Sequence, residues 1–284
     1  MKRYSIIHHT NYSFPDSVQL LPHTLRLRPR EGPELRIESS KLDIFPASSL
    51  RWHRDIEGNA VATANFSSRT NTLTIKSEVI IQQFDLDPLN CLVSDYAMYY
   101  PFKYTDDESC LLAPYLIDNT NEQDPIFNNW LSSTQYLGES IQSFTLLLQL
   151  AQHIFNTINY RKREEEGIQS VEHTLTCGTG SCRDLAWLFI VTARRLGIAT
   201  RFVSGYLHSN ALPGHSGSTH AWAESLLPGT GWKGFDPTIG GVAGSDHIAV
   251  AVAKDPQSVP PVAGSFYGGK GSKMDVEVWV SDIS

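Results

Sequence analysis

The sequence predicts an α+β protein in which an antiparallel β domain precedes a second domain of helices packed on an antiparallel sheet. Three observations support this class: strand-like alternation dominates residues 4–83, two helical patterns follow, and short strand-like segments come after the second helix. The 284 residues are enough for two domains, and a hydrophobic content of 41% is enough for a buried core.

The first segment has the pattern of antiparallel strands joined by turns. Apolar and polar residues alternate along residues 72–82, which is the period of a half-buried strand. Residues 55–59, with the sequence Asp-Ile-Glu-Gly-Asn, have turn chemistry between two strand-like runs. We therefore predict an N-terminal antiparallel β domain of short strands over residues 1–85.

Composition and hydrophobic periodicity change twice in the middle of the chain. Residues 86–139 are rich in Pro, Asn, Asp and aromatic residues without a clear period, and we predict a connector with short helical pieces. From residue 140 to 160, apolar residues recur at i, i+3 and i+4 spacing, which predicts a helix. This helix opens the second domain, which we predict over residues 140–284.

A second helix is predicted over residues 182–196. It follows a Gly-rich turn, and Gly197 stands where a helix commonly ends. Further strand-like segments are found at residues 200–207, 220–227, 232–236 and 274–280.

Composition and charge exclude several classes of partner. The net charge is −7 and there is no basic tract, so we expect neither nucleic acid nor a membrane surface as a partner. The N-terminus lacks the apolar run of a signal peptide, and no stretch approaches the ~20 apolar residues of a spanning helix. We expect a cytoplasmic protein. The four cysteines are too few and too scattered for a disulfide framework.

Three short segments supply the groups of a thiol-based active site. Cys182 would be the nucleophile, His220 the base that deprotonates it, and Asp236 the carboxylate that orients the base. Cys182 opens the predicted helix, where free N–H groups and the helix dipole favour a thiolate and can bind an oxyanion. His220 begins one strand and Asp236 ends the next, so antiparallel pairing would bring them side by side.

Metal binding is the competing chemistry at these positions. Zinc ligands could be drawn from Cys177, Cys182, His215 and His220. However, the two cysteines are separated by four residues, and no second matching pair of ligands is present. We therefore expect no metal and no cofactor.

At the three segments the sequence resembles the bacterial transglutaminase-like family, a papain-related group whose members are often labelled cysteine proteases. Residues 180–188 resemble the family's nucleophile helix, residues 219–224 its His strand, and residues 231–238 its Asp strand. The resemblance implies a papain-like catalytic domain. It also implies that Cys182, His220 and Asp236 carry the nucleophile, base and orienting roles.

The resemblance extends over nearly the whole chain. Residues 9–12, 25–30 and 55–59 resemble the β domain that precedes the catalytic domain in many bacterial members, and residues 247–251 and 259–264 resemble the family's tail.

These observations lead to three hypotheses about function. The first is a cysteine hydrolase that cleaves an amide bond in a peptide or protein substrate through a thioester acyl-enzyme. The second is transglutamination, in which an amine resolves the same acyl-enzyme; the triad is common to both, so the choice depends on which nucleophile reaches the thioester. The third is a non-catalytic binding or scaffold module. The natural substrate, the oligomeric state and the role of the β domain are left open.

Overall fold

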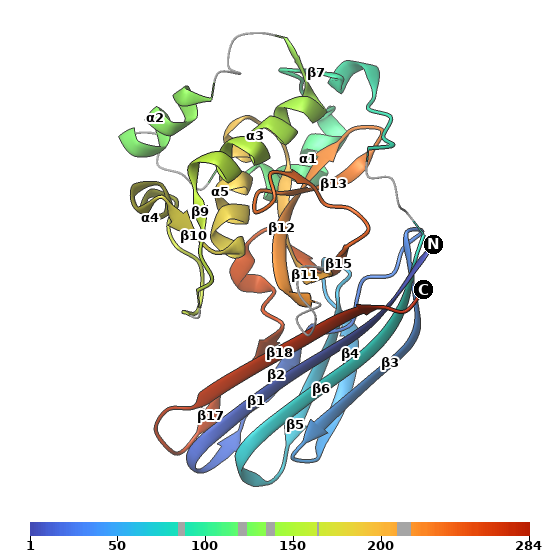
Figure 1. Ribbon diagram of the computed structural model, residues 1–284, viewed down its shortest axis with the longest axis vertical. Helices are drawn as coiled ribbons and strands as arrows, with labels where there is room; N and C mark the ends of the chain where they lie inside the picture. The colour runs from blue at the N-terminus through green and yellow to red at the C-terminus, as the bar shows by residue number, and fades with distance from the viewer. Residues whose placement is uncertain (85–88, 119–123, 135–139, 164, 209–216) are drawn as a thin grey trace.

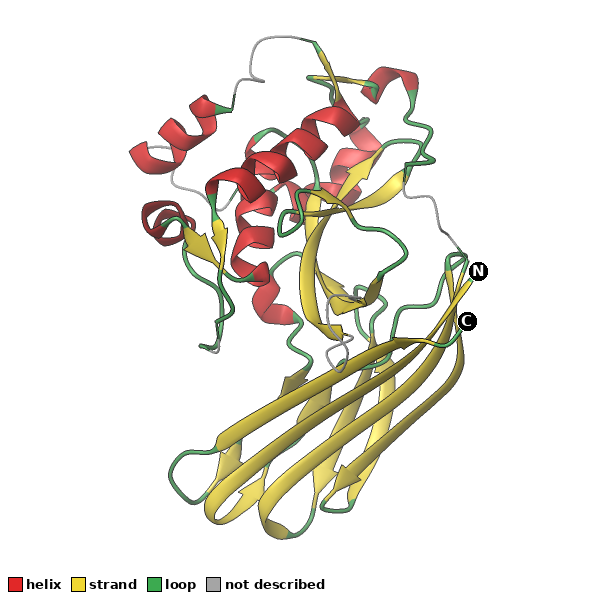
Figure 2. Ribbon diagram, viewed as in Figure 1, coloured by secondary structure: helices red, strands yellow, loops and turns green. Residues whose placement is uncertain are grey.

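The computed structural model describes residues 1–84, 89–118, 124–134, 140–163, 165–208 and 217–284. A β-sandwich lies below an α+β domain whose helices pack on an antiparallel sheet (Figures 1 and 2). The predicted α+β class is therefore confirmed, with the β domain and the helix-bearing domain in the predicted order.

The N-terminal domain is built from two antiparallel sheets. Its strands are β1 (Lys2–Leu20), β2 (His23–Leu25), β3 (Leu35–Phe45), β4 (Ser48–Arg54), β5 (Ala60–Phe66), β6 (Arg69–Gln83), β16 (Val262–Ala263), β17 (Phe266–Tyr267) and β18 (Lys273–Asp282). One sheet has the order β17-β1-β6-β3 with β18 also pairing with β1, and the other has the order β16-β2-β5-β4.

Side chains from the two sheets meet in an apolar core. Leu73 and Ile75 of β6 alternate with exposed or half-buried residues and pack against Leu25 and Ala62 of the other sheet. The turn predicted at residues 55–59 joins β4 and β5. The strands β1 and β6, with 19 and 15 residues, are much longer than the short strands that we predicted.

The C-terminal tail returns to the N-terminal domain. β18 runs antiparallel to β1, with Tyr4 opposite Asp282, so the tail lies in the same sheet as the start of the chain. The predicted second domain covers residues 140–284, whereas strand pairing places β16, β17 and β18 in the sheets of the first domain. The alternating pattern predicted the strand but not its partner, because a period of two specifies a buried face and not a neighbour.

The second domain contains five helices among the described residues. They are α1 (Asp106–Leu116), α2 (Pro125–Ser133), α3 (Ser143–Thr157), α4 (Val171–Cys177) and α5 (Cys182–Arg195), with 3-10 turns η1 (Asp95–Ala97) and η2 (Pro256–Ser258). The helix predicted over 140–160 is α3. Its predicted last residues instead form β9 (Asn159–Tyr160), which pairs with β10 (Thr179–Gly180), and a second short pair consists of β7 (Tyr99–Tyr100) and β8 (Ile141–Gln142).

The main sheet of this domain has the order β14-β13-β12-β11-β15. Its strands are β11 (Thr200–His208), β12 (Gly217–Leu227), β13 (Gly231–Asp236), β14 (Gly241–Val242) and β15 (His247–Ala253). α5 packs against β12 and shares one apolar core with α3 and with Phe127 of α2. The predicted connector therefore contributes to the core of the second domain.

A separate apolar cluster joins the two domains. Tyr4, Ile6 and Ile81 of the sandwich pack against Tyr206 of β11 and Ile248 of β15. β11 and β15 of the main sheet therefore lie against the sandwich. Within the described part of the chain, no helix is both long and apolar enough to cross a bilayer.

Candidate active site

Cys182 is the first residue of α5 and follows a tightly bonded turn. Gly178 ends α4 with a left-handed φ of 62°, and β10 then leads directly into α5. The backbone N–H and the hydroxyl of Ser181 both donate hydrogen bonds to Oδ2 of Asp184, at 2.8 and 2.7 Å. These bonds fix the N-terminus of α5, where unpaired N–H groups and the positive end of the helix dipole face Cys182.

Asp184 is a buried anchor for this helix. Its carboxylate also accepts hydrogen bonds from the N–H of Gln169 at 2.7 Å and from the guanidinium of Arg163 at 3.1 Å. Burial alone would raise the pKa of Asp184, but the hydrogen bonds from Gln169 and Ser181 and the charge of Arg163 outweigh it and lower the pKa. Asp184 thus stays ionised and connects the polar loop before α4 to α5.

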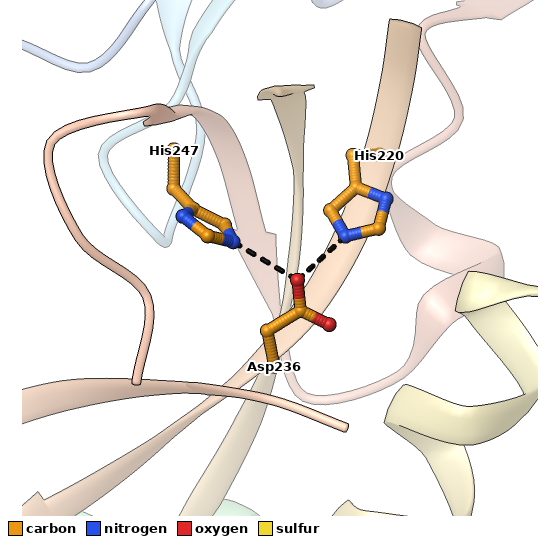
Figure 3. Close-up of side chains that lie close together, drawn as sticks. All are labelled: His220, Asp236 and His247. Atoms are coloured by element: carbon orange, nitrogen blue, oxygen red, sulfur yellow. Dashed lines mark hydrogen bonds and ion pairs between the residues drawn. The ribbon is translucent and has the colours of Figure 1, made fainter. Parts of the chain in front are cut away.

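His220 and Asp236 come from the neighbouring strands β12 and β13. The two strands are antiparallel, with Glu224 opposite Gly234, and a short turn connects them. The Nε2 atom of His220 lies 2.8 Å from Oδ2 of Asp236 (Figure 3). The structure thus brings this pair together, as antiparallel pairing of the two segments predicts.

The Asp236 carboxylate is fully buried and has donors on both oxygens. Oδ1 accepts hydrogen bonds from the N–H and the hydroxyl of Thr238, at 2.8 and 2.6 Å, and Oδ2 contacts His220 and His247. Burial alone would raise the pKa of Asp236, but the hydrogen bonds from the two histidines outweigh it and hold the pKa well below its usual range. Asp236 is therefore a carboxylate.

His220 is held in its protonated form. Burial alone would lower its pKa, but the hydrogen bonds to Asp236 and Cys182, together with their charges, raise the pKa of His220 to about 10. Because Nε2 faces Asp236, Nδ1 is the ring nitrogen available to the Cys182 thiol. The structure therefore brings all three sequence-predicted residues into one site, with His220 between the thiol and the carboxylate.

Trp222 supports the two histidines beside Asp236. Its ring stacks on His220 with the centroids 6.3 Å apart and meets the edge of His247 at 5.2 Å. A Cβ atom on Gly205 would lie 2.7 Å from this ring, so the glycine of β11 makes room for Trp222.

Sequence reasoning missed three residues near the site. His247 contacts Asp236 at 2.9 Å, and Thr238 donates to the same carboxylate. Tyr160 of β9 pairs with Gly180 of β10, two residues before Cys182, and burial followed by the charges of Cys182 and Asp236 raises its pKa. The residues matched to the family included Thr238 and His247, but their spacing gave no indication of a contact with Asp236.

Of the four side chains considered as zinc ligands, His215 lies outside the described residues. Cys177 belongs to a different place, since its sulfur contacts Nε2 of His173 at 3.5 Å on the exposed side of α4. Among the described residues, Cys177, Cys182 and His220 therefore do not come together as a metal-ligand group.

His220, Asp236 and His247 are the described side chains close enough together to hold a metal ion, with their ligand atoms within 4.8 Å of one another. The N–H of Gly244 donates to Nδ1 of His247 at 3.2 Å, so Nε2 of this neutral ring carries the proton that points at Asp236. To bind a metal ion beside Asp236, His247 would need a lone pair on Nε2. The contacts therefore fit a hydrogen-bond network better than a metal centre.

Comparison with known families matches both domains. Residues 4–82 match the bacterial transglutaminase-like N-terminal region, and residues 135–237 match the transglutaminase-like superfamily. The second match contains Cys182, His220 and Asp236. The chain therefore contains a transglutaminase-like core domain preceded by the bacterial transglutaminase-like N-terminal region.

Similar proteins match nearly the whole length of the chain. An uncharacterized protein of Mycobacterium tuberculosis is 27% identical over 97% of this chain and 91% of its own length, and one of Mycobacterium leprae is 22% identical over 100% of both. A crystal structure from Cytophaga hutchinsonii, described as a "putative cysteine protease", matches with a TM-score of 0.75 at 17% identity, over 100% of this chain and 91% of that one. This match shows a common fold.

Proposed function

We propose that this protein is a cysteine-dependent hydrolase that cleaves an amide bond in a peptide or peptide-like substrate. The observation that carries the proposal is the 2.8 Å contact between Nε2 of His220 and Oδ2 of Asp236, which leaves Nδ1 of a protonated ring for Cys182. The match of residues 135–237 to the transglutaminase-like superfamily and the fold shared with the Cytophaga hutchinsonii protein support the same class of chemistry.

The first step forms the acyl-enzyme. With the Cys182 proton already on His220, the thiolate sulfur forms a bond to the carbonyl carbon of the scissile amide. The carbonyl electrons move to oxygen, and the N–H of Cys182 at the start of α5 is the natural first donor to this oxyanion. When the oxyanion collapses, the carbon–nitrogen bond breaks and His220 protonates the departing amine.

The second step releases the acyl group. Neutral His220 takes a proton from water, the oxygen attacks the thioester carbonyl, and the carbon–sulfur bond breaks. The products are a carboxylic acid and the Cys182 thiolate, which pairs again with protonated His220. Asp236 keeps the ring oriented and stabilises its positive charge throughout.

Transfer of a glutamine acyl group to an amine is the second candidate, supported by the match to the transglutaminase-like superfamily. The first step is the same, with the Gln side chain as acyl donor and ammonia as the leaving group. An amine then replaces water in the second step. The thiolate, the base and the carboxylate have the same roles in both reactions.

The test is to trap the acyl-enzyme and identify the product. The full chain is incubated with a panel of peptides, with and without primary amines, and intact mass is compared with that of Cys182→Ala. We expect an adduct on Cys182 that decays to a carboxylic acid. Decay to a new amide would favour the transferase, while binding of a peptide without adduct or product in any condition would favour the non-catalytic module.

A further inference from the structure

His247 is a second histidine on the candidate catalytic carboxylate (Figure 3). Its Nε2 atom lies 2.9 Å from Oδ2 of Asp236, the oxygen that His220 also contacts. The N–H of Gly244 fixes the opposite ring nitrogen as an acceptor, so His247 donates to Asp236 as a neutral Nε2–H ring. Two donors on one oxygen restrict rotation of the carboxylate, which in turn sets the orientation of His220.

A β-bulge turns His247 toward Asp236. Ser204 of β11 lies opposite Ala251 of β15, whereas the next residue, Gly205, lies opposite Ala249, so β15 contains one extra residue. Side chains alternate along a strand. The extra residue therefore moves His247 and Ala249 to the face opposite the one that they would share with Ala251.

The N-terminal domain covers the outer edge of the strand that carries His247. β15 is the last strand of its sheet, so its outward backbone groups need partners from elsewhere. Asn59 provides both kinds: its Nδ2 donates to the carbonyl of Val252 at 2.8 Å, and its Oδ1 accepts from the N–H of Val252 at 2.9 Å. The N–H of Arg30 donates to the carbonyl of Ala249 at 2.9 Å.

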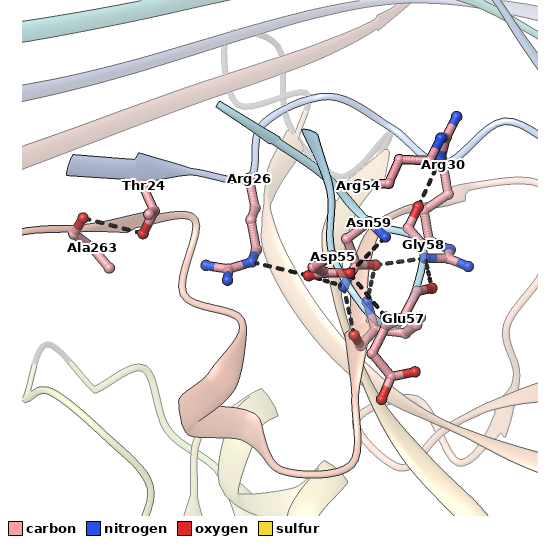
Figure 4. A network of polar contacts seen from close by, with 10 residues as sticks. Thr24, Arg26, Arg30, Arg54, Asp55, Glu57, Gly58, Asn59 and Ala263 are labelled. Carbon is pink, nitrogen blue, oxygen red and sulfur yellow. Dashed lines mark hydrogen bonds and ion pairs between the residues drawn. The ribbon is translucent and has the colours of Figure 1, made fainter. Parts of the chain in front are cut away.

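Asn59 is itself fixed by the turn between β4 and β5 (Figure 4). Oδ1 of Asp55 accepts from the N–H groups of Glu57 and Asn59, at 3.0 and 2.9 Å, and its Oδ2 accepts from Nδ2 of Asn59 at 3.0 Å. Asn59 is completely buried. The turn thus presents one rigid amide to the edge of β15.

The start of β15 is held by the same domain. Tyr4 and Lys2 donate to Oδ1 of Asp246, the residue before His247, at 2.8 and 2.9 Å. The side-chain amide of Gln83 reaches the carbonyl of His247 at 3.5 Å. Contacts from β1, from β6 and from the turn after β4 therefore fix the backbone on both sides of the bulge.

We propose that His247 is a positioning residue for Asp236, and that the N-terminal domain, through Asn59, holds the strand that carries it. The proposal rests on the proposed function, because Asp236 matters in this way only as the partner of His220. It gives the β domain a role in supporting the active site.

The first experiment measures the rate at which iodoacetamide alkylates Cys182 in the folded full-length protein, which requires no known substrate. His247→Leu fills the space of the ring with an apolar side chain but removes the donor to Asp236. We expect alkylation of Cys182 to slow by about tenfold or more, because a hydrogen bond to a charged group is lost. His247→Gln places an N–H near the same oxygen and should stay within about threefold of wild type. Equal rates for His247→Leu and wild type would overturn the proposal.

The second experiment tests the link to the N-terminal domain. Asn59→Ala is compared with Asn65→Ala, an exposed asparagine on β5, and with the double variant Asn59→Ala/His247→Leu, after thermal unfolding has shown that each is folded. We expect Asn59→Ala to slow alkylation several-fold and Asn65→Ala to leave it unchanged. The alkylation rate of the double variant should match that of His247→Leu within about twofold, because Asn59 is expected to act on Cys182 only through His247. Fully additive slowing would overturn the link.

A third measurement separates this proposal from the proposed function. Long-range nitrogen–proton NMR of histidine-labelled protein should show His247 as the neutral Nε2–H tautomer, and Asn59→Ala should change its ring-nitrogen shifts. If Cys182 of the wild type is no more reactive than the other cysteines, the proposed function fails. The NMR spectra still decide the positioning proposal. A charged or Nδ1–H His247 would overturn it, and so would ring-nitrogen shifts of His247 that do not change in Asn59→Ala.

Discussion

The Nε2 atom of His220 lies 2.8 Å from Oδ2 of Asp236, and both side chains are buried. In this setting the carboxylate stays ionised and the imidazole stays protonated, because each stabilises the charge of the other. The thiol of Cys182 interacts with the same ring. The pair therefore links a strand–turn–strand unit to the N-terminus of α5, and most of its consequences can be tested by substitution.

Replacement of Asp236 by Asn should slow turnover by roughly a hundredfold to ten-thousandfold. An amide retains one acceptor oxygen, but its NH2 group would face the N–H or hydroxyl of Thr238 or the rings of the two histidines. The measurement is kcat/KM on a peptide found by the trapping screen. Asp275→Asn, on the exposed part of β18, should leave it unchanged, and an Asp236→Asn protein of wild-type activity would argue against the orienting role.

Cys182→Ala should abolish turnover, because the acyl-enzyme needs the thiolate. His220→Ala should be nearly as severe, since the base and the proton donor are both lost. The double variant should cost little more than Cys182→Ala alone, because groups that act as one unit are strongly non-additive. The measurement is the single-turnover rate of the wild type, the two single variants and the double variant. Substantial activity in Cys182→Ala would exclude covalent catalysis by this residue.

The pKa of His220 makes stability depend on pH in a defined window. Its pKa is raised from an ordinary value of 6.5 to about 10, so the folded state binds more protons between these values. The stability from this group should be complete below pH 6.5 and should be lost as the pH rises toward 10. The slope should not exceed about 1.4 kcal/mol per pH unit.

Urea unfolding of wild type and His220→Gln across this window measures the effect. The difference in unfolding free energy should be largest near pH 6.5 and should shrink toward pH 10. A constant difference would mean that His220 is not protonated in the folded protein at neutral pH.

Asp184→Ala should lower the free energy of unfolding by about 1.5–3 kcal/mol, because it removes the buried carboxylate that pairs with half-buried Arg163, whose other partner is Glu165 at 3.6 Å. The N-terminus of α5 also loses the bonds from Ser181. Asp107→Ala, in the exposed first turn of α1, is a matched control and should change stability by less than about 1 kcal/mol. Equal stability of the two variants would contradict the anchoring role of Asp184.

Local patterns in the sequence determined the elements that carry the candidate triad. The apolar spacing and the Gly-rich turn before Cys182 define α5, which begins at the predicted residue. His220 and Asp236 lie on strands joined by a short turn, so their pairing follows from the segment that contains them. Each of these features depends on residues close together in the chain, and for that reason it could be read without the fold.

Only the tertiary structure decided which distant segments support these elements. His247 reaches Asp236 because a bulge shifts β15 against β11, and Asn59 reaches β15 across 193 positions of sequence. β18 pairs with β1 at the opposite end of the chain. An alternating pattern says which face of a strand is buried, whereas the partner of an edge strand depends on how the domains pack, so these contacts had no local pattern to predict them.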